Sequence, residues 1–132
     1  MIVHVVDGTY ELFRHFFAVP SRLGPDDLEI GAARAVAGSL LSMLEEGATH
    51  VGVATDHVIE SYRNDLYPGY KTGAGIDPAL RGQFDLLEEL LRGLGFTVWP
   101  EVMYEADDAL AASAAVAAAD ERVERVMICT PD

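Results

Sequence analysis

The chain has 132 residues, 50% of them hydrophobic, and a formal net charge of −13 from 22 acidic and 9 basic residues. This length suits one compact domain with a sizeable core and leaves no room for a second domain of ordinary size. A protein that binds nucleic acid only by neutralising phosphates is usually basic, so the charge argues against that class. It agrees with a carboxylate cluster that loads metal ions.

Cysteine content and apolar runs indicate the cellular environment. The single Cys129 cannot form an intrachain disulfide, which is typical of a reducing compartment. Apolar runs all fall short of the roughly 18 to 20 residues that span a bilayer. The N-terminus has no basic segment before its apolar stretch and no small-residue cleavage site. We therefore expect a soluble cytoplasmic domain with no membrane partner.

The first half of the chain alternates between apolar runs and helical patterns. Residues 2–6 are β-branched except for His4 and lead to Asp7-Gly8, a polar turn, and Thr9 can cap the helix that follows. A second apolar run ends at another acid, Asp56. We predict, in chain order, a strand over 2–6, a helix over 9–17, a loop over 20–27, a helix over 30–44 and a strand over 50–55.

The second half continues the alternation. Pro78 opens a strongly amphipathic pattern that stops at Gly95, and an alanine-rich helix follows Tyr104. The last apolar run leads to Asp132. We predict a short helix over 59–66, a mobile loop over 67–75, a helix over 78–94, a strand over 96–99, a helix over 105–119 and a strand over 125–129.

Strands that alternate with helices predict an α/β domain with a mostly parallel sheet flanked by helices, and we expect the first strand to be central. Ligands of such sheets bind beyond the carboxyl ends of the strands. Asp7, Asp56 and Asp132 all follow strands, and Glu105, Asp107 and Asp108 begin a helix. The topology therefore gathers acids at one edge of the sheet.

Carboxylates in this arrangement suit the hydrolysis of phosphodiesters. Two divalent ions about 4 Å apart can generate hydroxide and stabilise the leaving oxygen, and Mg²⁺ prefers carboxylate oxygens. Glu105 and Asp108 are three residues apart and share a helix face. Acids in the first turn of a helix also act as simple capping residues, and acids after strands act as turn formers. The convergence of several such acids favours a metal site.

Several runs resemble the divalent-metal-dependent 5′→3′ exonuclease and flap-nuclease superfamily, which has a three-layer PIN-like fold. They are VDGTYELFRHFF at residues 6–17, ATD at 54–56, YRNDLYPGYK at 62–71, YEADD at 104–108 and TPD at 130–132. These runs keep the family's order across essentially the whole chain. The tyrosine-lysine run and the Glu-Ala-Asp-Asp run are the most specific of them.

The resemblance implies a role for each matching residue. It implies Mg²⁺ or Mn²⁺ as cofactor, with two ions in the complete enzyme, and DNA as partner, bound at 5′ ends, flaps or single strands. Lys71 would approach the scissile phosphate, and Arg63 and Tyr70 would steer the strand, Tyr70 by stacking on a base. The other interpretations are a solvated Lys71, a packed Tyr70, and an Arg63 paired with Asp65 or Glu60. The implied metal ligands, direct or through water, are Asp7, Asp56, Glu105, Asp107, Asp108 and Asp132.

Some features depart from the family's pattern. The second acid of the family's Thr-Gly-Asp-Lys-Asp box would lie beyond Asp132, and Pro131 replaces the small residue before the first. We interpret residues 1–132 as the N-terminal part of the domain, without the family's C-terminal helical DNA-binding region. We expect these residues alone to cleave weakly or not at all, and an uncovered face of the last strand to favour self-association.

Three rival functions differ from a DNA exonuclease. A haloacid-dehalogenase-type phosphatase would need a nucleophilic acid two residues before Asp7, where Val5 stands. A PIN-type ribonuclease has a similar layout of acids and an RNA substrate. An inactive or truncated nuclease-fold module could bind metal or a partner without turnover. A metal-dependent cleavage assay separates these hypotheses.

Overall fold

The computed structural model describes residues 1–131. Strands and helices alternate along the chain, as the sequence predicts, with short helical turns in the longer connections. The elements are β1 (Ile2–Asp7), α1 (Gly8–Ala18), the 3-10 turn η1 (Pro25–Asp27), α2 (Gly31–Glu45), β2 (His50–Asp56), α3 (Arg63–Leu66), α4 (Pro78–Arg81), α5 (Gln83–Gly93), β3 (Thr97–Glu101), α6 (Ala106–Ala118) and β4 (Arg125–Cys129).

All four strands are parallel, in the order β3-β2-β1-β4. The first strand is central, as predicted. Val5 and Val6 of β1 and Val53 of β2 are almost fully buried, which is typical of strands covered on both faces. In register, Asp7 of β1 pairs with Ala54, and Asp56 of β2 pairs with Glu101 of β3. The carboxyl ends of these strands therefore meet at one edge.

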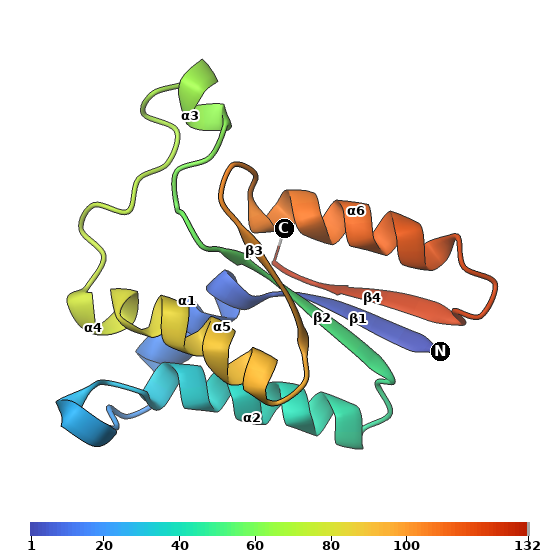
Figure 1. Ribbon diagram of the computed structural model, residues 1–132, viewed down its shortest axis with the longest axis horizontal. Helices are drawn as coiled ribbons and strands as arrows, with labels where there is room; N and C mark the ends of the chain where they lie inside the picture. The colour runs from blue at the N-terminus through green and yellow to red at the C-terminus, as the bar shows by residue number, and fades with distance from the viewer. Residues whose placement is uncertain (132) are drawn as a thin grey trace.

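Helices cover both faces of the sheet, which gives the predicted three layers (Figure 1). On one face α1, α2 and α5 pack on a core that includes Leu12, Leu40, Leu91 and Val53. On the other face α6 packs on a smaller core through Leu110, against alanine and valine side chains of β1 and β2. The segment that carries α3 extends beyond the sheet, on the side where α6 begins (Figure 1).

Three elements differ from the sequence prediction by more than a one-residue shift of an end. The short helix is confined to Arg63–Leu66, and the long amphipathic helix is divided into α4 and α5 at Gly82. β3 covers Thr97–Glu101 rather than 96–99, so it contains Pro100. A proline is tolerated here because β3 is an edge strand, which has a hydrogen-bonded neighbour on one side only. The shift places Glu101 at the end of the strand.

Apolar side chains remain exposed around the edge strand β4 and beside α6. Met127 and Ile128 of β4 are 42% and 53% exposed, and a mainly apolar groove of about 820 Å³ runs past Trp99 and Val116. Self-association through such a surface stays a prediction. Among residues 1–131, no helix is long and apolar enough to cross a membrane.

Candidate metal centre

The acids after β1 and β2 and the acids that begin α6 come together at the carboxyl edge of the sheet. They surround a cavity of about 310 Å³. Among residues 1–131, the side chains that line it are all charged or phenolic: Asp7, Asp56, Tyr70, Lys71, Glu105 and Asp107. The topology thus brings four of the six predicted acids, Asp7, Asp56, Glu105 and Asp107, to one cavity at the predicted edge.

Asp7 is the last residue of β1 and also the N-cap of α1. Its Oδ1 accepts a hydrogen bond of 3.0 Å from the Tyr10 N–H, and the residue is 9% exposed. Burial, together with the charges of Asp56 and Asp107, raises the pKa of Asp7 to about 6. The protein itself therefore stabilises the ionised form of Asp7 poorly, as expected for a carboxylate that binds a cation.

Gly8 allows α1 to start directly against β2. A Cβ atom at this position would lie 2.6 Å from Cγ1 of Val53, closer than real side chains approach. At the second residue of the helix, the Thr9 hydroxyl accepts a hydrogen bond of 2.8 Å from the Asp56 N–H. These contacts fix the ends of β1 and β2 side by side, and with them Asp7 and Asp56.

Asp56 connects the end of β2 to the start of α6. Its Oδ1 accepts from the Ala106 N–H at 2.8 Å, one of the free donors in the first turn of α6. Its Oδ2 lies 3.0 Å from Nζ of Lys71. Asp56 is 7% exposed, so this carboxylate is held on two sides inside the protein.

Glu105 and Asp108 lie at the N-terminus of α6, and the capping interpretation holds in part. Oδ2 of Asp108 accepts from the Glu105 N–H at 2.9 Å, the geometry of one half of a capping box. Both carboxylates also contact cations from another segment of the chain. An acid can therefore cap α6 and also contact the cations beside the cavity.

Arg63 of α3 holds both of these carboxylates. Its Nη1 and Nη2 donate to the two oxygens of Asp108 at 3.0 Å each, a bidentate pair, and Nη1 also donates to Glu105. The hydrogen bonds from Arg63 lower the pKa of Asp108. Arg63 thus pairs across 42 and 45 residues of sequence, whereas the local alternatives were Asp65 and Glu60.

Lys71 and Tyr70 close the cavity from the loop after α3. Nζ of Lys71 lies 3.0 Å from Oδ2 of Asp56 and 3.1 Å from Oε1 of Glu105, and the Tyr70 hydroxyl donates to Glu105 at 3.2 Å. Burial alone would lower the pKa of Lys71, but the contacts with Asp56 and Glu105 outweigh it and raise the pKa. Burial opposes ionisation of Glu105 too, yet Lys71 and Arg63 lower its pKa overall.

Three further acids complete the account of the site. Asp107 is exposed and lines the cavity. Asp132 lies outside the described residues. Glu101, at the end of β3, was not identified from the sequence, yet burial and the charges of Asp108 and Asp56 raise its pKa. Its position after a strand, like that of Asp7 and Asp56, is the signal that could have found it.

The side chains that converge on the cavity suit a hard divalent cation. The acids offer only oxygen donors, which Mg²⁺ and Mn²⁺ prefer. The raised pKa of Asp7 marks a place where positive charge would be stabilising. Lys71 and Arg63 form ion pairs with Asp56, Glu105 and Asp108. They therefore offset the negative charge of Asp7 less than the charges of these three acids. The residues present therefore fit a metal ion.

Comparison with known protein families gives a match over residues 2–132, to the model described as the 5′-3′ exonuclease, N-terminal resolvase-like domain. The chain belongs to this family. Its relatives include DNA polymerase I of Mycobacterium leprae, 34% identical over 132 residues, and the thermostable DNA polymerase I of Thermus thermophilus, also 34% identical over 132 residues. The alignments cover 97% and 98% of this chain and 14% and 16% of those polymerases.

This 5′-3′ exonuclease-family chain also resembles a solved structure. The T5 D15 protein, co-crystallised with metal ions, superimposes with a TM-score of 0.69 at 19% sequence identity. The match covers 100% of this chain and 49% of that protein. At this identity the likeness establishes the fold, and it agrees with the PIN-like, three-layer architecture predicted from the sequence.

Proposed function

We propose that this chain provides the metal-binding part of a divalent-metal-dependent 5′→3′ nuclease that hydrolyses DNA phosphodiester bonds. The observation that carries the proposal is the cavity at the carboxyl edge of the sheet, where Asp7, Asp56, Glu105 and Asp107 meet Lys71. Membership of the 5′-3′ exonuclease family supports the reaction class. Because the chain spans about one seventh of its polymerase relatives, the activity of a longer protein is part of the proposal.

The acids would hold Mg²⁺ or Mn²⁺, two ions in the complete enzyme. Asp7, Asp56, Glu105, Asp107 and Asp108 are the proposed ligands, direct or through water, and Asp132 is proposed from its sequence motif. A metal held by these residues would supply a hydroxide nucleophile and stabilise the leaving oxygen. The protein's own contribution is to hold buried carboxylates in fixed positions, as the bonds from Tyr10 to Asp7 and from Ala106 to Asp56 do.

Lys71 is proposed to act on the reacting phosphate. It is the only lysine in the sequence, and its ammonium lies inside the cavity, 3.0 Å and 3.1 Å from two proposed ligands. A phosphodiester drawn into this cavity would place its negative charge beside that ammonium. The positive charge offsets the growing charge of the transition state, so Lys71 should affect turnover more than substrate binding.

Arg63 and Tyr70 are proposed to guide the nucleic-acid strand. Tyr70 is 48% exposed at the edge of the cavity, where an aromatic ring can stack on a base. Arg63 holds Glu105 and Asp108 while about a third of its side chain (30%) stays exposed. It can therefore orient two proposed ligands and still present positive charge to a phosphate.

A cleavage assay with matched variants tests the proposal. Labelled 5′-flap DNA, single-stranded DNA and RNA are incubated with the protein in Mg²⁺, Mn²⁺ or EDTA. In a version extended to the length of the family's nuclease region, we expect metal-dependent release of 5′ products from DNA that is lost in Asp107→Asn and retained in Glu121→Gln, whereas residues 1–132 alone should release little or none. Glu121 is an exposed acid outside the set of proposed ligands, so Glu121→Gln is a matched control. Binding of Mn²⁺ is followed in parallel through the melting temperature.

The outcomes distinguish the rival functions. Cleavage of RNA alone would favour the PIN-type ribonuclease. A Mn²⁺-dependent rise in melting temperature without cleavage, also in a version extended to the length of the family's nuclease region, would favour a metal-binding module without turnover. Cleavage that persists in EDTA or in Asp107→Asn would contradict the proposal.

A further inference from the structure

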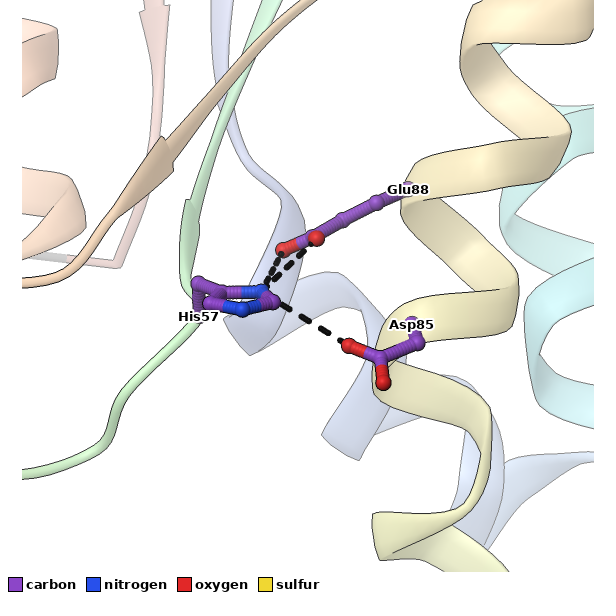
Figure 2. A group of neighbouring side chains, drawn as sticks. All are labelled: His57, Asp85 and Glu88. Carbon is purple, nitrogen blue, oxygen red and sulfur yellow. Dashed lines mark hydrogen bonds and ion pairs between the residues drawn. The ribbon is translucent and has the colours of Figure 1, made fainter.

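A second group of metal-ligating side chains lies outside the cavity, between the end of β2 and α5. His57 follows Asp56 directly, and Asp85 and Glu88 project from α5 toward its imidazole ring (Figure 2). Nδ1 of His57 lies 2.9 Å from Oε1 of Glu88 and 3.6 Å from Oδ1 of Asp85. One donor atom from each residue lies within 4.8 Å of the other two.

The alternation of β2 places this cluster on the face opposite the carboxylate cavity. Asp56 contacts Ala106 of α6, whereas its neighbours Thr55 and His57 both contact Glu88 of α5. Asp85 and Glu88 are three residues apart and share one face of α5. The cluster is therefore built from a strand end and a helix that the fold already holds together.

Glu88 is the fixed part of the cluster. It is 4% exposed, and its Oε2 accepts a hydrogen bond of 2.6 Å from the Thr55 hydroxyl. Among the described residues its ion-pair partner is His57, and neither lysine nor arginine compensates it. A buried carboxylate needs positive charge nearby, and an outer hydroxyl that orients a carboxylate is a common feature of metal sites.

The spacing and the donor types suit a transition metal. Bonds of about 2.0 to 2.2 Å in a tetrahedral site separate the ligand atoms by roughly 3.3 to 3.5 Å, and the distances of 2.9 and 3.6 Å from His57 bracket that value. Imidazole nitrogen suits Zn²⁺ and neighbouring metals, whereas the oxygen-only cavity suits Mg²⁺. The side chains of His57 and Asp85 are 40% and 79% exposed, so solvent can reach a fourth coordination position.

We propose that His57, Asp85 and Glu88 form a second metal site, which takes Zn²⁺ or a similar transition metal with three protein ligands and one open position. A metal ion here joins the end of β2 to α5, directly behind Asp56. Its binding stabilises the fold and leaves the composition of the carboxylate cavity unchanged. The proposal rests on these contacts alone and does not depend on nuclease activity.

Zn²⁺ titration in excess Mg²⁺ tests the site, because Mg²⁺ saturates oxygen-only ligands while leaving imidazole available. The imidazole nitrogen signals of His57 are followed by NMR, with His57→Ala for assignment. We expect a saturable shift that ends at one equivalent of Zn²⁺ and does not occur with Mg²⁺ alone. The melting temperature should rise over the same range of Zn²⁺ concentration.

Matched variants on α5 decide whether the three residues act together. Asp85→Asn changes an exposed side chain, so the fold is retained, and it should weaken Zn²⁺ binding by about tenfold or more. Glu89→Gln removes a neighbouring exposed acid outside the cluster and should leave the dissociation constant unchanged. The absence of a saturable His57 shift would overturn the proposal. Zn²⁺ binding that survives Asp85→Asn and Glu88→Gln but is lost in Asp107→Asn would overturn it too.

Discussion

Asp7→Asn should stabilise the metal-free protein at neutral pH, although it removes a proposed metal ligand. Burial and the neighbouring charges of Asp56 and Asp107 raise the pKa of Asp7 from 3.8 to about 6. A shift of roughly 2 pKa units corresponds to about 3 kcal/mol between the two protonation states. Asparagine is also a good N-cap residue, so it can keep the hydrogen bond from Tyr10.

The pH dependence of this effect has a defined sign. Between the unfolded pKa of 3.8 and the folded pKa of about 6, native Asp7 binds more protons than unfolded Asp7. The contribution of Asp7 to the free energy of unfolding therefore falls as pH rises through this window and is constant above it. The difference between Asp7→Asn and the wild type should be near zero at pH 3.5 and approach about 3 kcal/mol at pH 8.

Urea denaturation in EDTA at several pH values measures this difference, and the Glu121→Gln variant controls for the loss of one negative charge. In Mn²⁺ the stability advantage of Asp7→Asn over the wild type should become smaller, because the wild type gains stability from metal binding that Asp7→Asn lacks. If Asp7→Asn is no more stable than the wild type at pH 8, or if the difference does not change with pH, the account of a charge-strained Asp7 is wrong.

Two more substitutions test the contacts around the cavity. Lys71→Met should bind Mn²⁺ more tightly in a titration of free Mn²⁺, because the ammonium no longer competes with the metal for Asp56 and Glu105. Its turnover should fall. Weaker Mn²⁺ binding would contradict this competition. Gly8→Ala should lower the free energy of unfolding by about 1 to 3 kcal/mol, because the new Cβ would lie 2.6 Å from Cγ1 of Val53. An unchanged urea midpoint would show that α1 can shift away from β2 without loss of stability.

The sequence predicted the layout of the sheet and the placement of the acids well. Alternating strands and helices require a parallel sheet, and in a parallel sheet the carboxyl ends of neighbouring strands lie at one edge. Asp7 and Asp56 end mostly apolar runs, and Glu105 caps the start of a helix, so their convergence follows from local patterns alone.

Contacts that cross long stretches of sequence were harder to predict. Arg63 pairs with Glu105 and Asp108 across more than 40 residues, and nothing in its local pattern distinguishes these partners from Asp65. The partners of His57 lie 28 and 31 residues further along the chain. Alternation in β2 assigns Asp56 and His57 to opposite faces, but only the packing of α5 shows which side chains meet His57.

Anomalous diffraction from crystals soaked in Mn²⁺ tests the central claim most directly. The account predicts a Mn²⁺ peak inside the cavity, bound by oxygens of Asp7, Asp56, Glu105 or Asp107, with Nζ of Lys71 moved away from its contacts at 3.0 and 3.1 Å. A cavity without a peak at Mn²⁺ concentrations that raise the melting temperature would contradict the assignment of these acids as the metal centre.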